Sequence, residues 1–365
     1  MKKKLLSVLT ALLTAIALCI GMVACSNGTV DTFNGALSKE SYESSDDAVA
    51  GFLATEISGA AVNAELVDYK KTGDLTQQQI DELEVGEVLE EGDTIVSAEI
   101  VDVTYKRSTR TGYASAPSSA EQNTAVFTIY IIIITPNGTT VKEYRYYVPK
   151  ANNGDVLTRS YFEDVLNPEK YVNCTQEYSS TSNTKIGNTS SETKINYTIK
   201  TADNRASLEM TMPNLSNLGM TNTTIYGYFE EVDDVFSAWM SQDGTNYTNA
   251  EYTFLSYGIK DMTSFVSMCL PQFDHSYYEK TSYGFKIQDE FLSEYVAKAL
   301  NEALGATDVK AELEIKVREG RISKMTSKIT ATIEAVVLKM NITAKEEVEF
   351  SKFGSTSVNR PVSIA

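Results

Sequence analysis

The chain has 365 residues, with 49 acidic and 32 basic side chains, and its formal net charge at pH 7 is −17. An acidic surface of this kind repels nucleic-acid phosphates and anionic lipid headgroups, which argues against nucleic-acid binding and against membrane attachment through a basic patch. The sequence contains one histidine, which excludes a metal site built from several histidines.

Residues 1–25 have the layout of a bacterial secretory signal that ends in a lipidation site. Three lysines precede an apolar stretch, residues 5–20, which is shorter than the roughly 20 residues that a membrane-spanning helix needs. Residues 22–25, MVAC, resemble the bacterial lipobox, in which a cysteine receives a diacylglyceryl group and becomes the first residue after cleavage. The resemblance implies a signal peptide at 1–24 and a membrane anchor on Cys25, with acyl chains such as palmitate.

This N-terminus predicts a lipoprotein on the extracytoplasmic face of a bacterial cell membrane. The alternative is an uncleaved N-terminal anchor with an incidental Cys25, which also places the bulk of the chain outside the cytoplasm. Cleavage removes three lysines and no acid, so the mature chain has a formal charge of about −20. Residues 25–41, rich in Ser, Asn, Gly and Thr, are expected to form a flexible tether between the anchor and the first domain.

Residues 42–168 are predicted to form an α+β domain with a helix lying across an antiparallel sheet. Ser45 is placed to cap a helix whose first turn is acidic and whose apolar face ends near Gly59. Thr76 and Gln79 fit the capping box of a second, short helix. The helices and the sheet together resemble the cystatin-like and nuclear-transport-factor-like folds.

The β-strands of this domain are indicated by β-branched and aromatic residues. The turn at 136–138, Pro-Asn-Gly, joins two of them in a hairpin, and the run of four isoleucines at 131–134 indicates a central strand buried on both faces. A closing helix is expected at 158–166. The expected strands cover residues 94–105, 126–135 and 139–148.

Residues 173–365 are predicted to form a second domain, which begins with a Ser-, Thr- and Asn-rich loop at 179–194. A helix with a broad apolar stripe ends at Gly305, and the alternation of apolar and charged residues from 309 to 317 is typical of a half-buried antiparallel strand. Further strands are expected at 194–200, 207–212, 223–230, 234–241 and 340–350.

The C-terminal half resembles a known family of envelope lipoproteins. After the helix come VKAELEIKVREGRISKMTSKITATIE and KMNITAKEEVEFSKFGSTSVNRP, an order similar to the end of the lipoprotein-localisation-factor family (the LolA, LppX and LprG type). The resemblance covers about residues 190–362. It implies an α+β protein whose C-terminal part is a curved antiparallel half-barrel, covered by helices, over an apolar cavity that holds acyl chains. It implies no catalytic residues.

Two functions follow from these patterns, and neither is enzymatic. In the first, the half-barrel binds a lipid or another apolar ligand; in the second, the tethered chain is an interaction or sensor module that binds protein or cell-wall polymer through its sheet surfaces. No cofactor or metal is expected in either. The candidate cavity lining consists of Leu208, Met210, Met212, Ile225, Phe229, Phe236, Trp239, Met240, Phe265, Met268, Tyr295, Leu300 and Leu313.

A search for catalytic and metal-binding patterns yields no signature. The sequence lacks a G-x-S-x-G elbow and a Walker-type glycine loop. His275, beside Asp274 and Glu279, is expected to be a surface or interdomain histidine. The acidic run at 81–93 lacks the ligand spacing of an EF-hand, so a solvated acidic face is favoured over a calcium site.

Three further features leave alternatives open. Cys174 and Cys269 form a disulfide if the compartment is oxidising, or remain buried thiols in a chain long enough to hold a core without a disulfide. The apolar segment 335–338 is expected to line a cavity mouth or touch a membrane; the alternatives are that the strand continues through it, or that its tip packs on the N-terminal domain. Six tyrosines either form a surface on which carbohydrate or peptide stacks, or simply occupy ordinary β-sheet positions. They are Tyr144, Tyr146, Tyr147, Tyr277, Tyr278 and Tyr283.

Overall fold

The structure is a computed structural model that describes residues 35–83, 88–109, 124–149, 156–212, 223–256, 259–335 and 338–364. The described residues divide into two compact units: 35–165 together with 274–282, and 166–273 together with 283–364. The predicted signal peptide and Cys25 lie outside the described residues. Within the described part, none of the helices has the length and apolar character needed to cross a membrane.

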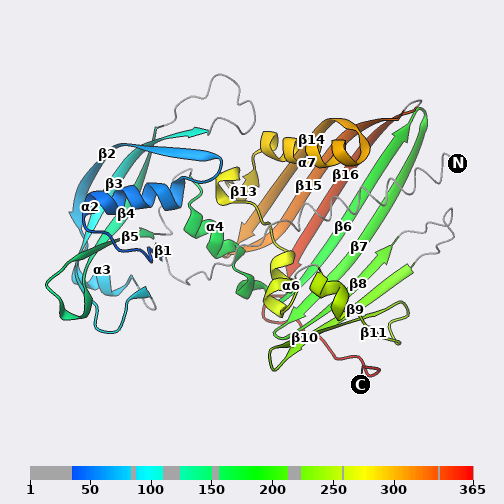
Figure 1. The fold of residues 1–365 in the computed structure, drawn as a ribbon, viewed down its shortest axis with the longest axis horizontal. Coiled ribbons are helices and arrows are strands. Elements are labelled where there is room, and N and C mark those ends of the chain that lie inside the picture. The colour runs from blue at the N-terminus through cyan, green and yellow to red at the C-terminus, as the bar shows by residue number, and fades with distance from the viewer. Residues whose placement is uncertain are drawn as a thin grey trace. The chain divides into compact units, whose positions relative to one another are not determined.

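The first unit contains an open antiparallel sheet with the strand order β1-β5-β4-β3-β2 (Figure 1). Its strands are β1 (Gly35–Leu37), β2 (Val62–Asp74), β3 (Thr94–Thr109), β4 (Thr124–Thr135) and β5 (Glu143–Pro149). Its helices are α2 (Ser45–Phe52), which continues as a π-helical turn at Leu53–Ile57, then α3 (Gln77–Asp81) and α4 (Arg159–Leu166).

Helix α2 lies across this sheet and closes its core. Phe52 of α2 is fully buried, and its ring lies 5.5 Å from that of Phe127 on β4 and 5.8 Å from that of Tyr146 on β5. The predicted helix on an antiparallel sheet is therefore confirmed. So are the 136–138 hairpin, the central buried strand at 131–134 and the capping box at Thr76.

Two N-terminal predictions need correction. Helix α2 is capped by Ser44 rather than Ser45, because Ser44 keeps an extended backbone and its hydroxyl accepts a hydrogen bond from the Asp47 amide. Residues 35–37 of the expected tether instead form the edge strand β1, which pairs with β5 and buries Leu37. Residues 25–34 lie outside the described residues.

The second unit is built on one broad antiparallel sheet, here called the large sheet. Within this unit its strands follow the order β11-β10-β9-β8-β7-β6-β16-β15-β14-β13. They are β6 (Asn173–Ile186), β7 (Thr189–Ala202), β8 (Arg205–Met212), β9 (Thr223–Val232), β10 (Val235–Ser241), β11 (Thr248–Asn249), β13 (Gly284–Ile287), β14 (Ala306–Arg318), β15 (Arg321–Ala335) and β16 (Leu338–Ser351).

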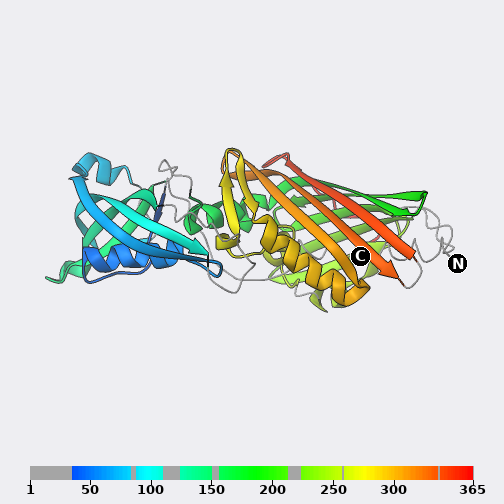
Figure 2. The same cartoon turned by 90° about the horizontal axis from the view of Figure 1, so that it is seen from above.

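Helices α5 (Glu251–Ser256), α6 (Met262–Met268) and α7 (Asp289–Leu304) accompany the large sheet, and Figure 1 shows α6 and α7 on its near side. Helix α7 runs along β14, as Figure 2 shows from above, and the Ser293 hydroxyl accepts a hydrogen bond from the Ala311 amide. Gly305 ends α7 in the left-handed conformation with φ 64°, as predicted.

The prediction of a loop at 179–194 is wrong. Strands β6 and β7 run through it and pair residue by residue, and β6 also pairs with β16 from Thr175 to Ile186. Serine and threonine are frequent in loops, but here they lie consecutively along a strand that has a partner strand on each side, so their backbone groups are satisfied by the sheet. The chain is thus an α+β protein with two open antiparallel sheets.

Candidate functional site

One face of the large sheet, here called the inner face, carries α6 and contains most of the residues predicted to bind an apolar ligand. The ring of Phe265 of α6 lies 4.6 Å from that of Phe229 of β9, and the ring of Phe236 of β10 is stacked with that of Phe229 at 6.3 Å. Leu208 and Met268 pack at the margin of this cluster. The aromatic cluster therefore fixes α6 to the inner face.

The apolar surface continues beyond the cluster along neighbouring strands. Met210 of β8 lies opposite Ile225 of β9 and opposite Tyr197 of β7, and Met240 of β10 lies opposite Gly227 of β9. Because side chains alternate between the two faces of a strand, this register places Met210, Ile225 and Met240 on the inner face beside Leu208. All are only half-buried, which leaves an apolar surface next to the filled core.

The remaining predicted residues lie elsewhere, and Trp239 requires a correction. Since Ala238 and Met240 face inward, Trp239 faces outward, where it packs with Tyr228, Val358 and Ile364. Tyr295 of α7 instead contacts Phe273, at 5.1 Å between ring centroids. Leu300 is buried on α7, Leu313 is half-buried on β14, and the side chain of Met212 lies outside the described part.

A polar strip crosses the inner face beside this apolar surface, along β6 and β16. Glu346 of β16 is buried and accepts hydrogen bonds from the Tyr178 hydroxyl at 2.6 Å and from the Ser327 hydroxyl at 3.1 Å. Burial raises the pKa of Glu346, and these two hydrogen bonds offset part of that effect. The strip also contains the inward-facing residues Gln176, Ser180, Ser182 and Thr184 of β6.

The raised pKa of the buried Glu346 predicts the direction in which protein stability changes with pH. Its pKa is higher in the folded than in the unfolded chain, so above about pH 4.5 the folded state binds more protons at this site. Stability should then fall as pH rises through the raised pKa, and Glu346→Gln should remove that fall. Urea unfolding measured from pH 4 to pH 8 checks this.

The adjacent Glu347 provides a matched control, because its pKa is shifted in the opposite direction. It faces outward, and its ion pair with Lys324, at 2.6 Å, lowers its pKa. Its contribution is therefore present at neutral pH and lost as pH falls, so Glu347→Gln should destabilise the protein slightly at pH 7 and not at pH 3. Identical pH profiles for the two variants would contradict the assignment of Glu346.

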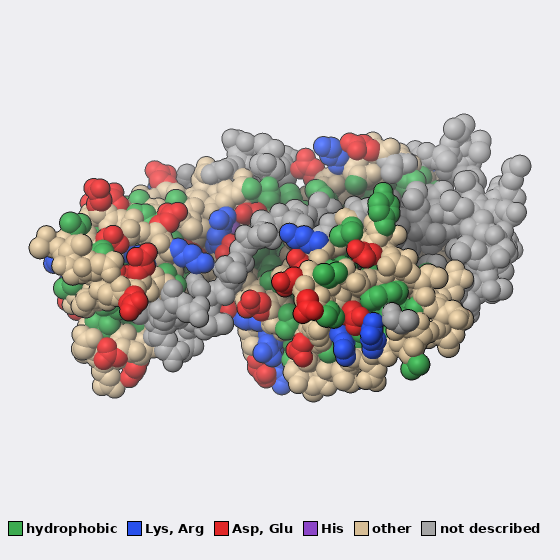
Figure 3. Space-filling view, turned by 60° about the horizontal axis from the view of Figure 1, so that its bottom comes forward, with side chains coloured by type: hydrophobic (Ala, Val, Ile, Leu, Met, Phe, Trp, Pro, Cys, Tyr) green, Lys and Arg blue, Asp and Glu red, His purple; other side chains and the backbone are tan. Residues whose placement is uncertain are grey.

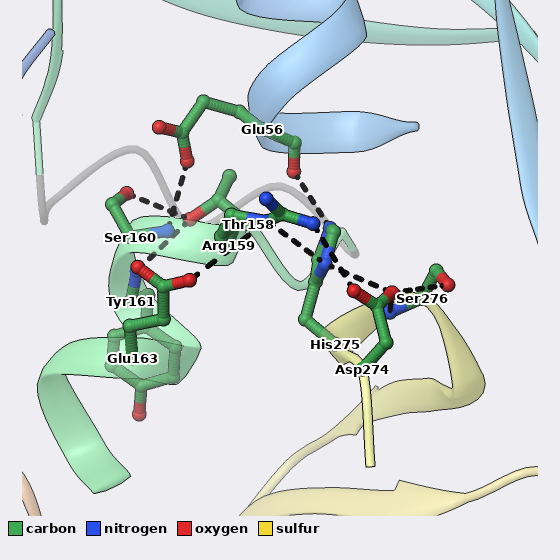
Figure 4. Close-up of polar contacts among 9 residues, drawn as sticks. All are labelled: Glu56, Thr158, Arg159, Ser160, Tyr161, Glu163, Asp274, His275 and Ser276. Atoms are coloured by element: carbon green, nitrogen blue, oxygen red, sulfur yellow. Dashed lines mark hydrogen bonds and ion pairs between the residues drawn. The ribbon is translucent and has the colours of Figure 1, made fainter. Parts of the chain in front are cut away.

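The first unit contains a second polar cluster, which lies around His275 (Figure 4). His275 is 3% exposed, and its Nε2 donates a hydrogen bond to the Glu56 carbonyl oxygen at 3.1 Å. Arg159 of α4 forms an ion pair with Asp274 at 3.1 Å, and the buried Glu56 carboxylate accepts from the Ser160 amide at 2.8 Å. The expected surface or interdomain histidine is thus a buried one within the first unit.

The contacts of this cluster hold a segment of the chain. The Ser276 hydroxyl donates to Asp274 at 2.6 Å and accepts from the Ala61 amide at 3.1 Å. Burial alone would raise the pKa of Asp274, but hydrogen bonds from His275 and Ser276 outweigh burial and lower it. The cluster fastens Asp274–Ser282, which includes the short strand β12 (Tyr278–Thr281), to the first unit.

The substitution Asp274→Asn tests this fastening role. The amide can replace only part of the charge-assisted bonds to Arg159 and Ser276, so a loss of roughly 1–3 kcal/mol is expected in the free energy of unfolding at pH 7. The loss should shrink as pH falls, because the folded-state pKa of Asp274 is below its unfolded value. The exposed Asp68 on β2 is the control: Asp68→Asn should change stability by less than about 0.5 kcal/mol.

Cysteines and tyrosines resolve two of the open alternatives. Cys174 and Cys269 are both free thiols, and burial raises the pKa of Cys269 to about 12, which makes it a poor nucleophile. Four of the six candidate stacking tyrosines, Tyr146, Tyr147, Tyr277 and Tyr278, are buried, which is incompatible with a shared stacking surface. Within the described residues no group of three His, Cys, Asp or Glu side chains is arranged to hold a metal ion.

Comparisons with known proteins give few matches. No family model and no curated protein matches the sequence. A solved LolA superfamily protein from Nitrosomonas europaea is 9% identical and covers 55% of this chain and 94% of its own, with a TM-score of 0.21. A candidate outer membrane protein from Bacteroides fragilis is 10% identical and covers 69% and 92%, with a TM-score of 0.13. Likenesses this weak carry no argument about function.

Proposed function

We propose that this chain is a lipid-anchored extracytoplasmic lipoprotein that binds a lipid or another apolar ligand without catalysing a reaction. The ligand lies on the inner face of the large sheet, beside α6. In this proposal the large sheet curves into a half-barrel around the ligand.

The observation that supports this proposal is the half-buried apolar surface formed by Leu208, Met210, Ile225, Met240 and Met268. Apolar surface that adjoins a packed aromatic cluster is typical of ligand sites, because the cluster holds the surface rigid while leaving it open to a partner. Three of the five are methionines, whose unbranched side chains adapt to acyl chains of different shape. The Lys324–Glu347 pair of the same sheet lies on the opposite face, whereas Glu346 faces inward in the polar strip.

Membrane attachment in this proposal depends on Cys25. Its two acyl chains contribute about 0.8 kcal/mol for each CH₂ that enters the bilayer, so the acidic protein needs no basic surface to stay at the membrane. Figure 3 shows acidic side chains spread over the described part of one face and basic ones in small groups, which offers no extended basic patch there for nucleic acid.

A fluorescent fatty acid tests the proposed binding. The full chain with Cys25→Ser, which lacks the predicted lipidation site, should bind the probe saturably with a micromolar or lower Kd, and the same protein unfolded in urea should not. Titration by fluorescence anisotropy measures this. Absence of saturable binding to fatty acid, diacylglycerol and phospholipid probes alike would refute the proposal.

A further inference from the structure

The polar strip on the inner face contains buried polar atoms without partners. Ser182 is 2% exposed and Thr184 is 1% exposed, and neither hydroxyl makes a hydrogen bond to any residue that the structure describes. A buried polar atom without a partner is destabilising, so two of them on one side of one strand require a physical reason.

We propose that this strip binds the polar head of the ligand, and that this head is an uncharged, hydroxyl-bearing group such as a glycosyl or glyceryl group. The inference rests on the proposed function and specifies its ligand class. The apolar part of the same molecule then lies on the adjoining surface around Met210. The ligand is a neutral amphiphile rather than a phospholipid.

The positions of the unpartnered atoms suit such a head group. Ser182 and Thr184 are two residues apart on β6 and point to the same face, which places their hydroxyls about 7 Å apart. Each hydroxyl can both donate and accept a hydrogen bond. Hydroxyls of a sugar or of glycerol also donate and accept, so one polyol can satisfy both side chains without a change in protonation.

The charges around the strip argue against a phosphate. On the strands near the strip, every second residue faces inward. None of these inward residues is a lysine or an arginine. They are the alternate residues of 176–184 on β6, 191–199 on β7, 325–333 on β15 and 342–350 on β16, counted from the first of each range. The one charged residue among them is Glu346, a carboxylate that would repel a phosphate at short range. Lysines of these strands, such as Lys185, Lys194 and Lys345, occupy the alternate, outward positions.

The test compares two lipids that differ only in the head group. The full chain with Cys25→Ser is titrated with a monohexosyl diacylglycerol and with a phosphatidylglycerol carrying the same acyl chains, each in neutral detergent micelles. The hexosyl lipid should bind at least about tenfold more tightly. The double substitution Ser182→Ala and Thr184→Val should reduce hexosyl-lipid affinity about tenfold and leave fatty-acid affinity within about twofold.

The double variant is expected to fold, because it removes unpartnered polar atoms and adds none. Ser179→Ala with Thr181→Val, at outward positions of the same strand, is the control and should bind both lipids as the parent does. Equal binding of the two lipids, tighter binding of phosphatidylglycerol, or an unchanged hexosyl affinity in the double variant would overturn the head-group assignment. Failure of both lipids and of the fatty acid to bind would refute the proposed function itself.

Discussion

Replacing both Leu208 and Met210 with glutamate should weaken fatty-acid binding by at least about tenfold. The two residues are neighbours on the inward side of β8 and are half-buried at the centre of the apolar surface. A glutamate there remains ionised only if it stays hydrated, so an acyl chain loses its contacts along that part of the strand. Two CH₂ groups left in water cost about 1.6 kcal/mol, which exceeds a tenfold change in Kd.

A matched control separates this effect from a general effect of negative charge. Ser207→Glu with Thr211→Glu adds the same two charges to the same strand, but on the outward face. This variant should bind the probe within about twofold of the parent. If the two double variants lose affinity equally, or if neither does, the ligand does not lie on the inner face.

Phe229→Ala should lower the free energy of unfolding of the second unit by about 3–5 kcal/mol. Phe229 is fully buried in contact with Phe265 of α6 and Phe236 of β10. Its ring also lies over Gly227, where an added Cβ would lie 3.0 Å from it. Alanine leaves a cavity that a sheet and a capped helix cannot easily close. The lost aromatic contacts add to the cost.

Fluorescence of Trp239 measures this loss in the correct unit. It is the one tryptophan of the chain and lies on β10 of the large sheet, so urea unfolding followed by its emission reports on that sheet. Val232→Ala on the same strand as Phe229 is the control, because Val232 is 49% exposed and should cost less than about 0.5 kcal/mol. A loss below about 1 kcal/mol for Phe229→Ala would show that α6 is not held by this cluster.

Local patterns predicted most of the regular structure. The alternation in β14, the turn of β4 into β5 and the glycine that ends α7 each depend on residues close in sequence, and each was found. The prediction for 179–194 failed because the composition of this stretch is typical of a loop. Its first part instead belongs to β6, which pairs with β16, more than 150 residues away in the chain. Composition alone could not supply that partner.

The sequence predicted only part of the candidate site. Trp239 and Met240 are adjacent on one strand and cannot face the same side, which alternation alone would have shown. The polar strip was missed because its strand was taken for a loop, and the consecutive hydroxyl residues at 179–182 give no alternation that would mark one face. The cluster at His275 joins residues 219 positions apart, and no local signal marks Glu56 as its partner.

The most direct test of ligand binding is to identify what the protein carries. The full chain with Cys25→Ser is exported, purified without detergent and examined by native mass spectrometry, and the bound material is then extracted into organic solvent. The proposal predicts one neutral lipid per chain, absent from the Leu208→Glu and Met210→Glu variant and present in the Ser207→Glu and Thr211→Glu variant. Protein that carries no lipid, or both variants carrying it equally, would contradict a ligand site on the inner face.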